Sequence, residues 1–360
     1  DRGASIAPMG APGPTEGPLT FEELQLATRN RGMPLEALRH DVTPPGLHYL
    51  LIHFDIPDAD ESAWRLELEG LVAKPRTFSV RELKALPAKT VRVTMECAGN
   101  GRGQLTPRYP SVPWLEEGVS TADWTGVALL ELLELKKEAA QVVFHGADRG
   151  IDAGIEHHFA RSLSRTQALD GDVLVAYAMN GAPLPPQHGA PLRLVVPRWY
   201  GMASVKWLRS IEARDQPFDG PQQARSYHFR RVAGEKGEPC TLMRVNSLMA
   251  PPGIPDFYTR RRIVEAGPVE IVGRAWSGAA PVERVEFGLD GHWSNADVAP
   301  QRHAHSWKRW GFVWRAMPGE HELACRATDA AGNTQPLEPP WDLTGFGNNG
   351  VQRVQVTVRA

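Results

Sequence analysis

The chain has 360 residues, of which 42% are hydrophobic, and its 40 basic and 42 acidic side chains leave a formal net charge of −2. No basic stripe with interleaved aromatic residues occurs, so nucleic acid is a poor candidate partner. No uninterrupted apolar run approaches the ~18 residues of a membrane-spanning helix, and we expect a soluble globular protein long enough for two domains.

The three cysteines, Cys97, Cys240 and Cys325, are too few and too scattered for a disulfide framework or a structural zinc site. Cysteine usage therefore does not report the redox compartment. The sequence begins without a methionine, and no charged segment followed by an apolar one remains near its start. We expect either a periplasmic protein whose signal peptide has been removed or a cytoplasmic protein.

The first 42 residues form a predicted unit of their own. Residues 1–18 are rich in Gly, Pro, Ala and Ser and show little apolar periodicity, which predicts an arm without its own core. Thr20 followed by Glu23 is a capping-box pattern, which predicts a short helix that ends near residue 30.

Residues 43–238 mix strand and helix patterns. The apolar run at residues 48–54 predicts a strand that carries two histidines. Residues 64–72 alternate apolar and polar side chains, as in a half-buried antiparallel strand, so we do not expect an all-parallel sheet. Ser79 is placed to cap a helix. The other predicted elements are helices at residues 80–86 and 127–135 and strands at residues 141–146, 174–177 and 192–197.

The pattern changes after a junction at residues 230–268, which contains several prolines and glycines and three consecutive arginines. Short strands are predicted at residues 269–273, 282–287 and 321–327, separated by Gly, Asp and Asn turns. This pattern is typical of an immunoglobulin-like β-sandwich, which we assign to residues 239–360.

One cysteine lies in a loop that allows the backbone to approach a ligand closely. A β-branched stretch from Val91 leads into Glu96-Cys97-Ala98-Gly99-Asn100-Gly101-Arg102. Glycines allow positive φ and close backbone approach. A cation beside a thiolate lowers the thiol pKa and favours the form that binds metal or attacks carbon. On spacing alone, the alternative is that Cys97 is simply a core residue.

This loop resembles the signature loop of the sulfite oxidase family of molybdenum enzymes, whose cysteine ligates molybdenum held by a molybdopterin dithiolene. Further segments are similar to family segments in the same order, so the resemblance covers roughly residues 43–345. They are residues 176–185 (AYAMNGAPLP), 188–189 (HG), 191–197 (PLRLVVP), 205–208 (VKWL) and 273–278 (GRAWSG).

The resemblance implies an α+β fold in which a mixed-sheet molybdenum cofactor domain is followed by an immunoglobulin-like β-sandwich that pairs two chains into a homodimer. It implies oxygen-atom transfer, first of all the oxidation of sulfite to sulfate. No Cys-x-x-Cys-His haem site or cytochrome b5 pattern occurs, so we expect no haem in this chain and an external electron acceptor, either a cytochrome c-like protein or oxygen. The alternatives are a related molybdoenzyme with another substrate, such as a sulfoxide that is reduced, and a non-enzymatic β-sandwich interaction protein.

The resemblance also implies roles for individual residues. Cys97 would ligate the metal, Arg102 would attract an anionic substrate, and Tyr227 would place its phenol near the metal. Cofactor contacts are expected from His53, Cys97, His188, Arg193, Lys206 and Gln223. Arg193 interrupts an apolar strand, and a buried arginine needs an anionic or carbonyl partner, so a salt bridge to a protein carboxylate is the structural alternative for it.

The sequence departs from the family in the expected anion pocket. Family members that oxidise sulfite generally carry arginines at the positions where this chain has Leu51 and Thr344, and an aspartate where it has Ser226. The loss of two cations predicts either weak binding of sulfite or a preferred substrate that is not a dianion. A rescue is conceivable if Arg198 swings toward the metal.

Overall fold

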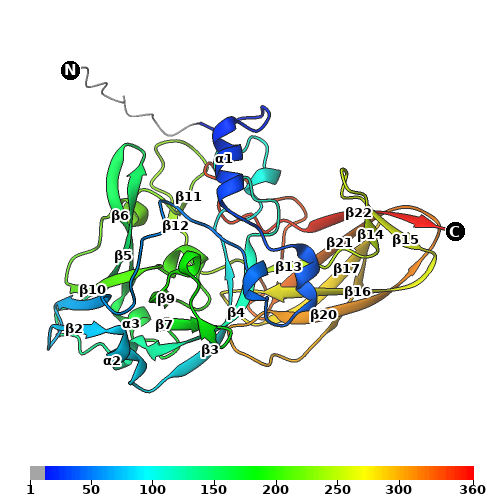
Figure 1. Cartoon of the computed structure of the whole chain (residues 1–360). Helices are drawn as coiled ribbons and strands as arrows, with labels where there is room; N and C mark the ends of the chain where they lie inside the picture. Colours follow the sequence, from blue (N-terminus) through cyan, green and yellow to red (C-terminus); the bar gives the residue numbers. More distant parts are fainter. Residues whose placement is uncertain (1–12) are drawn as a thin grey trace.

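The computed structural model describes residues 13–360, so residues 1–12 of the predicted N-terminal arm lie outside the described residues. The chain forms an N-terminal part with sheets and short helices, and a C-terminal part built from strands (Figure 1). Across the described residues, no helix is both long enough and apolar enough to cross a membrane. The helices are α1 (Phe21–Arg29), α2 (Val80–Lys84), α3 (Arg165–Ala168) and α4 (Pro221–Ala224), with 3-10 turns at Leu35–Arg39, Pro45–Leu47, Arg102–Gln104, Leu129–Glu131, Pro186–His188 and Gly201–Ala203.

Two five-stranded sheets form the N-terminal part, and a two-stranded ribbon, β11 (His228–Phe229) with β12 (Glu238–Pro239), follows them. In order across the first sheet lie β2 (Arg76–Ser79), β1 (Arg65–Gly70), β10 (Leu208–Arg214), β5 (Gln141–Asp152) and β6 (Ile155–Ser164). The second sheet contains β3 (Lys89–Glu96), β4 (Val119–Ala128), β7 (Leu174–Met179), β8 (Ala182–Pro183) and β9 (Arg193–Val195). Because β1 and β10 run parallel whereas their other neighbours are antiparallel, the prediction of a mixed sheet is confirmed.

The C-terminal part is a β-sandwich, as predicted. One sheet contains β13 (Asn246–Met249), β16 (Gly267–Trp276), β20 (Lys308–Ala316) and β19 (Asp297–Val298). The other contains β14 (Ile254–Pro255), β15 (Arg262–Glu265), β22 (Gln352–Arg359), β21 (Gly319–Asp329), β17 (Val282–Leu289) and β18 (His292–Asn295). Buried side chains from both sheets, among them Phe287, Trp310 and Val356, form a separate hydrophobic core between them.

The helix caps predicted from the sequence are confirmed. The Thr20 hydroxyl accepts a hydrogen bond from Glu23 N at 3.2 Å, and the Glu23 carboxylate accepts one from Thr20 N at 2.8 Å. Ser79 and Glu82 form the same reciprocal pair at the start of α2. Each cap satisfies donors that the first helical turn leaves free.

Two predicted elements are wrong. The chain at 127–135 is not a helix, because β4 continues to Ala128 and pairs with β7, so that strand pairing outweighs the helical spacing. The run at 48–54 is not a strand, and its only ladder contact among the described residues is a bridge between Leu50 and Arg31. Backbone N–H groups of this run donate to side chains instead of to a neighbouring strand. Tyr49 N donates to Ser120 Oγ, and Ile52 N donates to Asn30 Oδ1.

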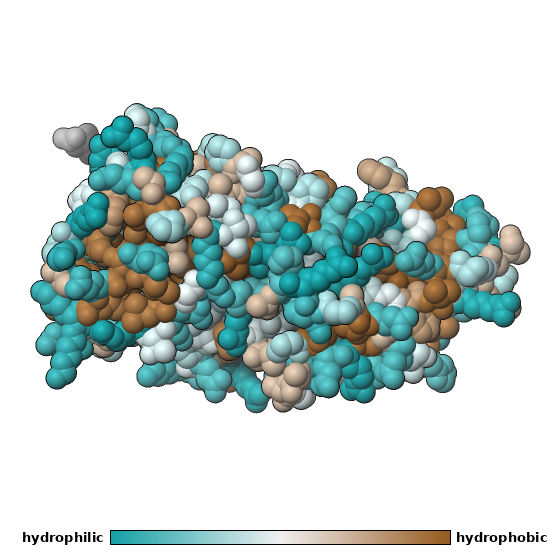
Figure 2. Space-filling model, turned by 90° about the horizontal axis from the view of Figure 1, so that it is seen from below, coloured by the Kyte–Doolittle hydropathy of each residue, from teal (hydrophilic) through white to brown (hydrophobic). Residues whose placement is uncertain are grey.

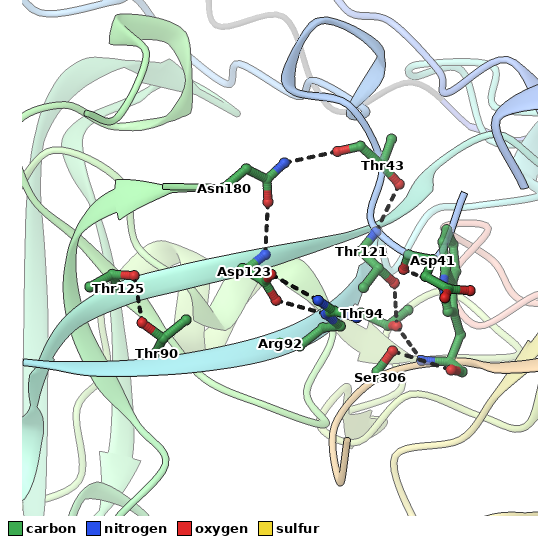
Figure 3. A network of polar contacts seen from close by, with 11 residues as sticks. Asp41, Thr43, Thr90, Arg92, Thr94, Thr121, Asp123, Thr125, Asn180 and Ser306 are labelled. Atoms are coloured by element: carbon green, nitrogen blue, oxygen red, sulfur yellow. Dashed lines mark hydrogen bonds and ion pairs between the residues drawn. The ribbon is translucent and has the colours of Figure 1, made fainter. Parts of the chain in front are cut away.

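Polar pairs hold β3 against β4 and fix the strand that precedes Cys97 (Figure 3). Arg92 donates to both carboxylate oxygens of Asp123, at 2.7 and 2.9 Å. The hydroxyls of Thr94 and Thr121 lie 2.6 Å apart, and Thr94 also accepts from Trp307 N of the C-terminal part. Cross-strand pairs of this kind stabilise a sheet and its register.

The buried carboxylate of Glu96, the last residue of β3, joins the two parts of the chain. Its Oε1 accepts from Asn246 Nδ2 at 3.1 Å and its Oε2 accepts from Trp276 Nε1 at 2.9 Å, both in the C-terminal part. Asn100, in the cysteine loop, donates to the same Oε1 at 3.1 Å. Burial raises the pKa of Glu96 to about 7, and the three hydrogen bonds oppose that rise.

We expect Trp276→Phe to lower the free energy of unfolding by about 1–3 kcal/mol, because it leaves a buried carboxylate oxygen without its donor. Urea unfolding followed by fluorescence and circular dichroism measures this loss. The matched control is Trp293→Phe on the edge strand β18, where the indole is only half-buried. Equal losses in the two variants would contradict the special role of the Glu96 contact.

Candidate active site

The cysteine loop begins where β3 ends. Cys97 is 6% exposed, its N donates to Gly118 O at 2.8 Å, and its carbonyl accepts from Asn100 N at 3.0 Å. Gly101 has a φ of 79°, and a Cβ there would lie 2.6 Å from the amide nitrogen of Asn348. Any other residue at position 101 would therefore have a strained backbone, and its Cβ would clash with Asn348.

A cavity opens beside Cys97 and brings together most of the residues predicted for the site. Cys97, His53, His188, Arg193, Lys206 and Tyr227 all line it. The sequence analysis missed other lining residues, including His48, Tyr49, Met95, Asp148, Phe159 and Ser204. His48 lies in the same apolar run as His53, so this run carried a signal. Asp148 lies within a shift in strand register between His145 and Arg149 of β5, which was not predicted from the sequence.

The cations of the cavity are held by carbonyl oxygens. Arg193 donates to His188 O at 2.9 Å and to Ser204 O at 3.1 Å, and Lys206 Nζ donates to Leu51 O at 2.7 Å. Within residues 13–360, neither side chain has a carboxylate within ion-pair distance, so the predicted alternative of a salt bridge for Arg193 is not found. Burial lowers the pKa of Arg193 to about 10 and that of Lys206 to about 7. An anionic ligand would offset this cost.

Three buried polar atoms on the cavity wall lack a hydrogen-bond partner among the residues described. They are Nε2 of His48, Nε2 of His188 and Oδ1 of Asp148. Burial lowers the pKa of His48 to about 3 and that of His188 to about 2, so both rings are neutral, and burial raises the pKa of Asp148 to about 6. Buried polar atoms normally have partners, so these atoms indicate a polar ligand.

Tyr227 and His53 form a hydrogen-bonded pair at the cavity. Tyr227 Oη and His53 Nε2 lie 2.6 Å apart. Burial raises the pKa of Tyr227 and lowers that of His53 to about 3, so the phenol keeps its proton and the imidazole is neutral. Tyr227 has a φ of 51°, which is strained for a bulky side chain and is typical of residues that a fold holds in place for function.

Arg102 lies beside the cysteine but is turned toward the C-terminal part. Its Nε donates to Thr344 O at 2.9 Å, and its guanidinium carbon lies 5.2 Å from the centroid of the Phe346 ring. Burial raises the pKa of the Cys97 thiol, and Arg102 opposes that rise only in part. Arg102 by itself lowers the thiol pKa, as expected. Desolvation raises the pKa by more, so the net shift is upward.

Arg198 and Gln223, which were expected near the metal or the cofactor, do not line the cavity beside Cys97. Arg198 does not swing toward the metal position, because its Nε donates to Gly278 O at 2.7 Å and its terminal nitrogen donates to Ala279 O at 3.1 Å. The hypothesis of a rescue by Arg198 is wrong for this structure. Gln223 lies in α4, where its Oε1 accepts from Ser162 N at 3.3 Å and its side chain does not line the cavity. A cofactor contact by Gln223 stays a prediction.

Two family models match the chain. The model described as an oxidoreductase molybdopterin binding domain matches residues 53–222, and the model described as a Mo-co oxidoreductase dimerisation domain matches residues 239–359. The chain belongs to the sulfite oxidase family of molybdopterin-dependent oxidoreductases. The cavity fits the family's cofactor, because it combines a buried cysteine, cations held by carbonyl oxygens and polar atoms that have no partner within residues 13–360.

Relatives within this family include enzymes named for different activities. A nitrate reductase of Brassica napus and the mitochondrial sulfite oxidase of Homo sapiens are each 31% identical to this chain and each cover 91% of it. The chain spans only 40% of that nitrate reductase and 64% of that sulfite oxidase. Among solved structures, the sulfane dehydrogenase SoxCD of Paracoccus pantotrophus matches with a TM-score of 0.78 and 25% identity, over 96% of this chain and 93% of that one.

We expect Lys206→Met to lose most of its bound molybdopterin while keeping its fold, because it removes one buried cation from an anion-binding cavity. A charge-assisted hydrogen bond is worth about 1.5–3 kcal/mol, or roughly ten- to hundredfold in retention. Pterin fluorescence after release and metal analysis measure the content. Lys74→Met, at an exposed lysine, is the matched control. Undiminished cofactor in Lys206→Met would contradict the assignment.

Proposed function

We propose that the chain is a molybdenum-dependent oxygen-atom-transfer oxidoreductase that oxidises a sulfur oxyanion, with sulfite to sulfate as the reference reaction, and passes the electrons to an external acceptor. The observation that carries the proposal is the cavity beside Cys97, where buried cations bond to carbonyl oxygens rather than to carboxylates. Such a cavity stabilises anions.

Different residues of the cavity would bind different parts of the cofactor. The Cys97 thiolate would ligate molybdenum, since a soft sulfur ligand suits this metal better than an oxygen ligand does. Arg193 and Lys206 would bind the phosphate. The free atoms of His48, His188 and Asp148 would pair with ring heteroatoms. When bound, the cofactor supplies two-electron redox chemistry coupled to oxygen-atom transfer.

The protein's own contribution is to hold and orient the substrate. Arg102 provides a permanent positive charge beside Cys97. The Tyr227 phenol stays protonated, and with the Nε2–H tautomer of the neutral His53 ring the imidazole donates to the phenol oxygen, which leaves the phenol O–H to donate a hydrogen bond to a substrate oxygen. Both side chains are almost fully buried, which strengthens these interactions because water does not screen them.

Nitrate reduction is a second candidate, supported by several nitrate reductases that are 30–32% identical to the chain. Nitrate carries one negative charge, which suits a site with Arg102 as its cation and with Leu51 on the cavity wall. Reduction of a sulfoxide stays a further alternative. Assays that run sulfite oxidation, nitrate reduction and sulfoxide reduction on the same preparation distinguish the three. The alternative of a non-enzymatic β-sandwich protein loses its basis with the match to the molybdopterin-binding family model.

We expect the isolated protein to hold about one molybdenum per chain, and we expect Cys97→Ser to fold but to lose catalysis, because a serine hydroxyl is a harder and far less acidic ligand than a thiol. Metal analysis and steady-state assays measure both. Cys325→Ser is the matched control, since that thiol is equally buried but lies in the sandwich core. Full activity in Cys97→Ser would contradict the assignment of Cys97 as the molybdenum ligand.

The sandwich, residues 239–360, is proposed to pair two chains about a twofold axis. The match to a dimerisation domain over residues 239–359 supports this. In Figure 2, apolar residues form several smaller patches on the right half of the molecule, where the sandwich lies, while a broader apolar patch covers part of the left half. Among the exposed apolar residues of the sandwich are Val313, at 69% exposure, and Met317, at 62%. Exposed apolar patches commonly mark protein interfaces.

We therefore expect the mass of a dimer in light scattering at micromolar concentration. Dilution should shift the mass toward the monomer only at much lower concentration, because interfaces between obligate partners are large and apolar. An exclusively monomeric mass at micromolar concentration would contradict the proposal.

A further inference from the structure

The C-terminal domain reaches the candidate active site through the segment 342–348, which lies between β21 and β22. The segment turns around Asp342, whose Oδ1 accepts from Thr344 N at 2.9 Å and from Phe346 N at 3.0 Å. Gly345 and Gly347 have φ values of 73° and 66°, which a residue with a side chain would adopt only under strain. The shape of the segment is thus fixed by its own residues.

Three hydrogen bonds attach this segment to the cysteine loop. Thr344 O accepts from Arg102 Nε at 2.9 Å, and Gly347 N donates to Ala98 O at 2.8 Å. Asn348 Nδ2 donates to Gly101 O at 2.8 Å. The segment and the loop that carries Cys97 therefore behave as one structural unit, although they come from different domains.

Phe346 stands between the two side chains expected to act on the substrate. Its ring stacks on Tyr227 with centroids 5.1 Å apart and planes 21° apart, and the Arg102 guanidinium lies 5.2 Å from its centroid. Because Tyr227 covers one face of the ring, Arg102 lies against the other. Arg161 lies 5.5 Å from the Tyr227 centroid, on the face that Phe346 leaves free. The order is Arg161, Tyr227, Phe346, Arg102.

This order limits the charge that a substrate can carry. A molecule that contacts both Tyr227 and Arg102 must lie along the edge of the Phe346 ring. Arg161 is separated from that space by the Tyr227 ring, and its terminal nitrogen bonds to Gln222 O. Leu51 and Thr344 are uncharged, and Arg198 bonds to Gly278 O and Ala279 O. Arg102 supplies the charge, and the apolar edge of the Phe346 ring lies beside it.

We propose that Phe346 is a specificity-determining residue and that the site prefers organic sulfinates, R–SO₂⁻, to sulfite; this rests on the proposed function. A sulfinate keeps the sulfur lone pair of sulfite but carries one negative charge, and a carbon substituent replaces the third oxygen. The single charge matches Arg102, one oxygen can accept from the Tyr227 phenol, and the substituent contacts the edge of the Phe346 ring.

The reaction balances as R–SO₂⁻ + H₂O → R–SO₃⁻ + 2 H⁺ + 2 e⁻. A new sulfur–oxygen bond forms, both O–H bonds of water break, and sulfur loses two electrons. The two electrons pass to the external acceptor of the proposed function, and in the assay below two ferricyanide ions each take one.

Methanesulfinate and sulfite form a matched pair, because they are close in size and differ in charge and in one methyl group. Their kcat/KM values should be measured on the molybdenum-loaded protein with ferricyanide as acceptor, in alkaline buffer where sulfite is a dianion. We expect the wild type to prefer methanesulfinate. Phe346→Leu should lower kcat/KM for methanesulfinate about tenfold more than that for sulfite, mainly through KM, since a lost apolar contact in a pocket is worth roughly tenfold or more. Thr344→Arg should shift the ratio about tenfold toward sulfite.

Phe312→Leu is the control, because Phe312 is also half-buried and stacks on Phe287 with planes 20° apart, but in the sandwich core. It should leave the substrate ratio unchanged. Phe346→Met, which has about the volume of leucine but an unbranched and more adaptable side chain, covers the case in which the leucine variant does not fold. Binding of the products methanesulfonate and sulfate, measured by calorimetry without turnover, should show the same preference and the same loss in Phe346→Leu.

A wild-type preference for sulfite, or equal losses on both substrates in Phe346→Leu, would overturn the proposal. Failure of the molybdenum-loaded protein to oxidise either compound would overturn it too, and the cofactor assignment would then still stand on the metal content. A protein without molybdenum would instead contradict the proposed function itself.

Discussion

The arrangement of the site depends on one buried carboxylate. Glu96 ends the strand that delivers Cys97 and accepts hydrogen bonds from the cysteine loop and from two residues of the C-terminal domain. A carboxylate removed from water is costly unless donors replace the lost hydration. Here the donors come from both domains, so the group is satisfied only when the domains are packed together and the loop is in place. Domain docking and loop geometry are thereby coupled.

The cavity beside Cys97 shows the opposite situation, in which charges and polar atoms are left unsatisfied. Arg193 and Lys206 are buried on carbonyl oxygens, and the histidines and Asp148 present free atoms. A protein that folded only for stability would pair or remove such groups. Their presence is best explained by an anionic ligand with many heteroatoms, and the pterin cofactor of the family meets that description.

Residues at the boundary between the domains also contact the loop that carries Cys97. The family model for dimerisation covers residues 239–359, yet residues 344–348 of that stretch contact the cysteine loop directly and place Phe346 between Tyr227 and Arg102. The C-terminal domain thus has two faces with different tasks. Changes in the segment 342–348 can alter the charge and shape of the site without touching the cofactor cavity, which offers a physical route by which one scaffold accepts different oxyanions.

The sequence by itself determined the features that depend on neighbouring residues or on motifs. These include the capping boxes at Thr20 and Ser79, the β-sandwich, the cysteine loop, and the family to which its residues point. Local rules suffice there, because a cap or a turn is satisfied within a few residues. Residues 127–135 mark the limit of such rules, since β4 extends to Ala128 by pairing with β7 and only a 3-10 turn at Leu129–Glu131 follows, where the pattern predicted a helix.

Only the tertiary structure decided which distant residues meet. Asp148 enters the cavity through a shift in strand register, Arg198 turns toward Gly278, and Glu96 finds Trp276 across 180 residues of sequence. Burial, not the neighbouring arginine, sets the direction of the Cys97 pKa shift. Desolvation and long-range hydrogen bonds depend on the packed chain as a whole, so no local pattern of residues encodes them.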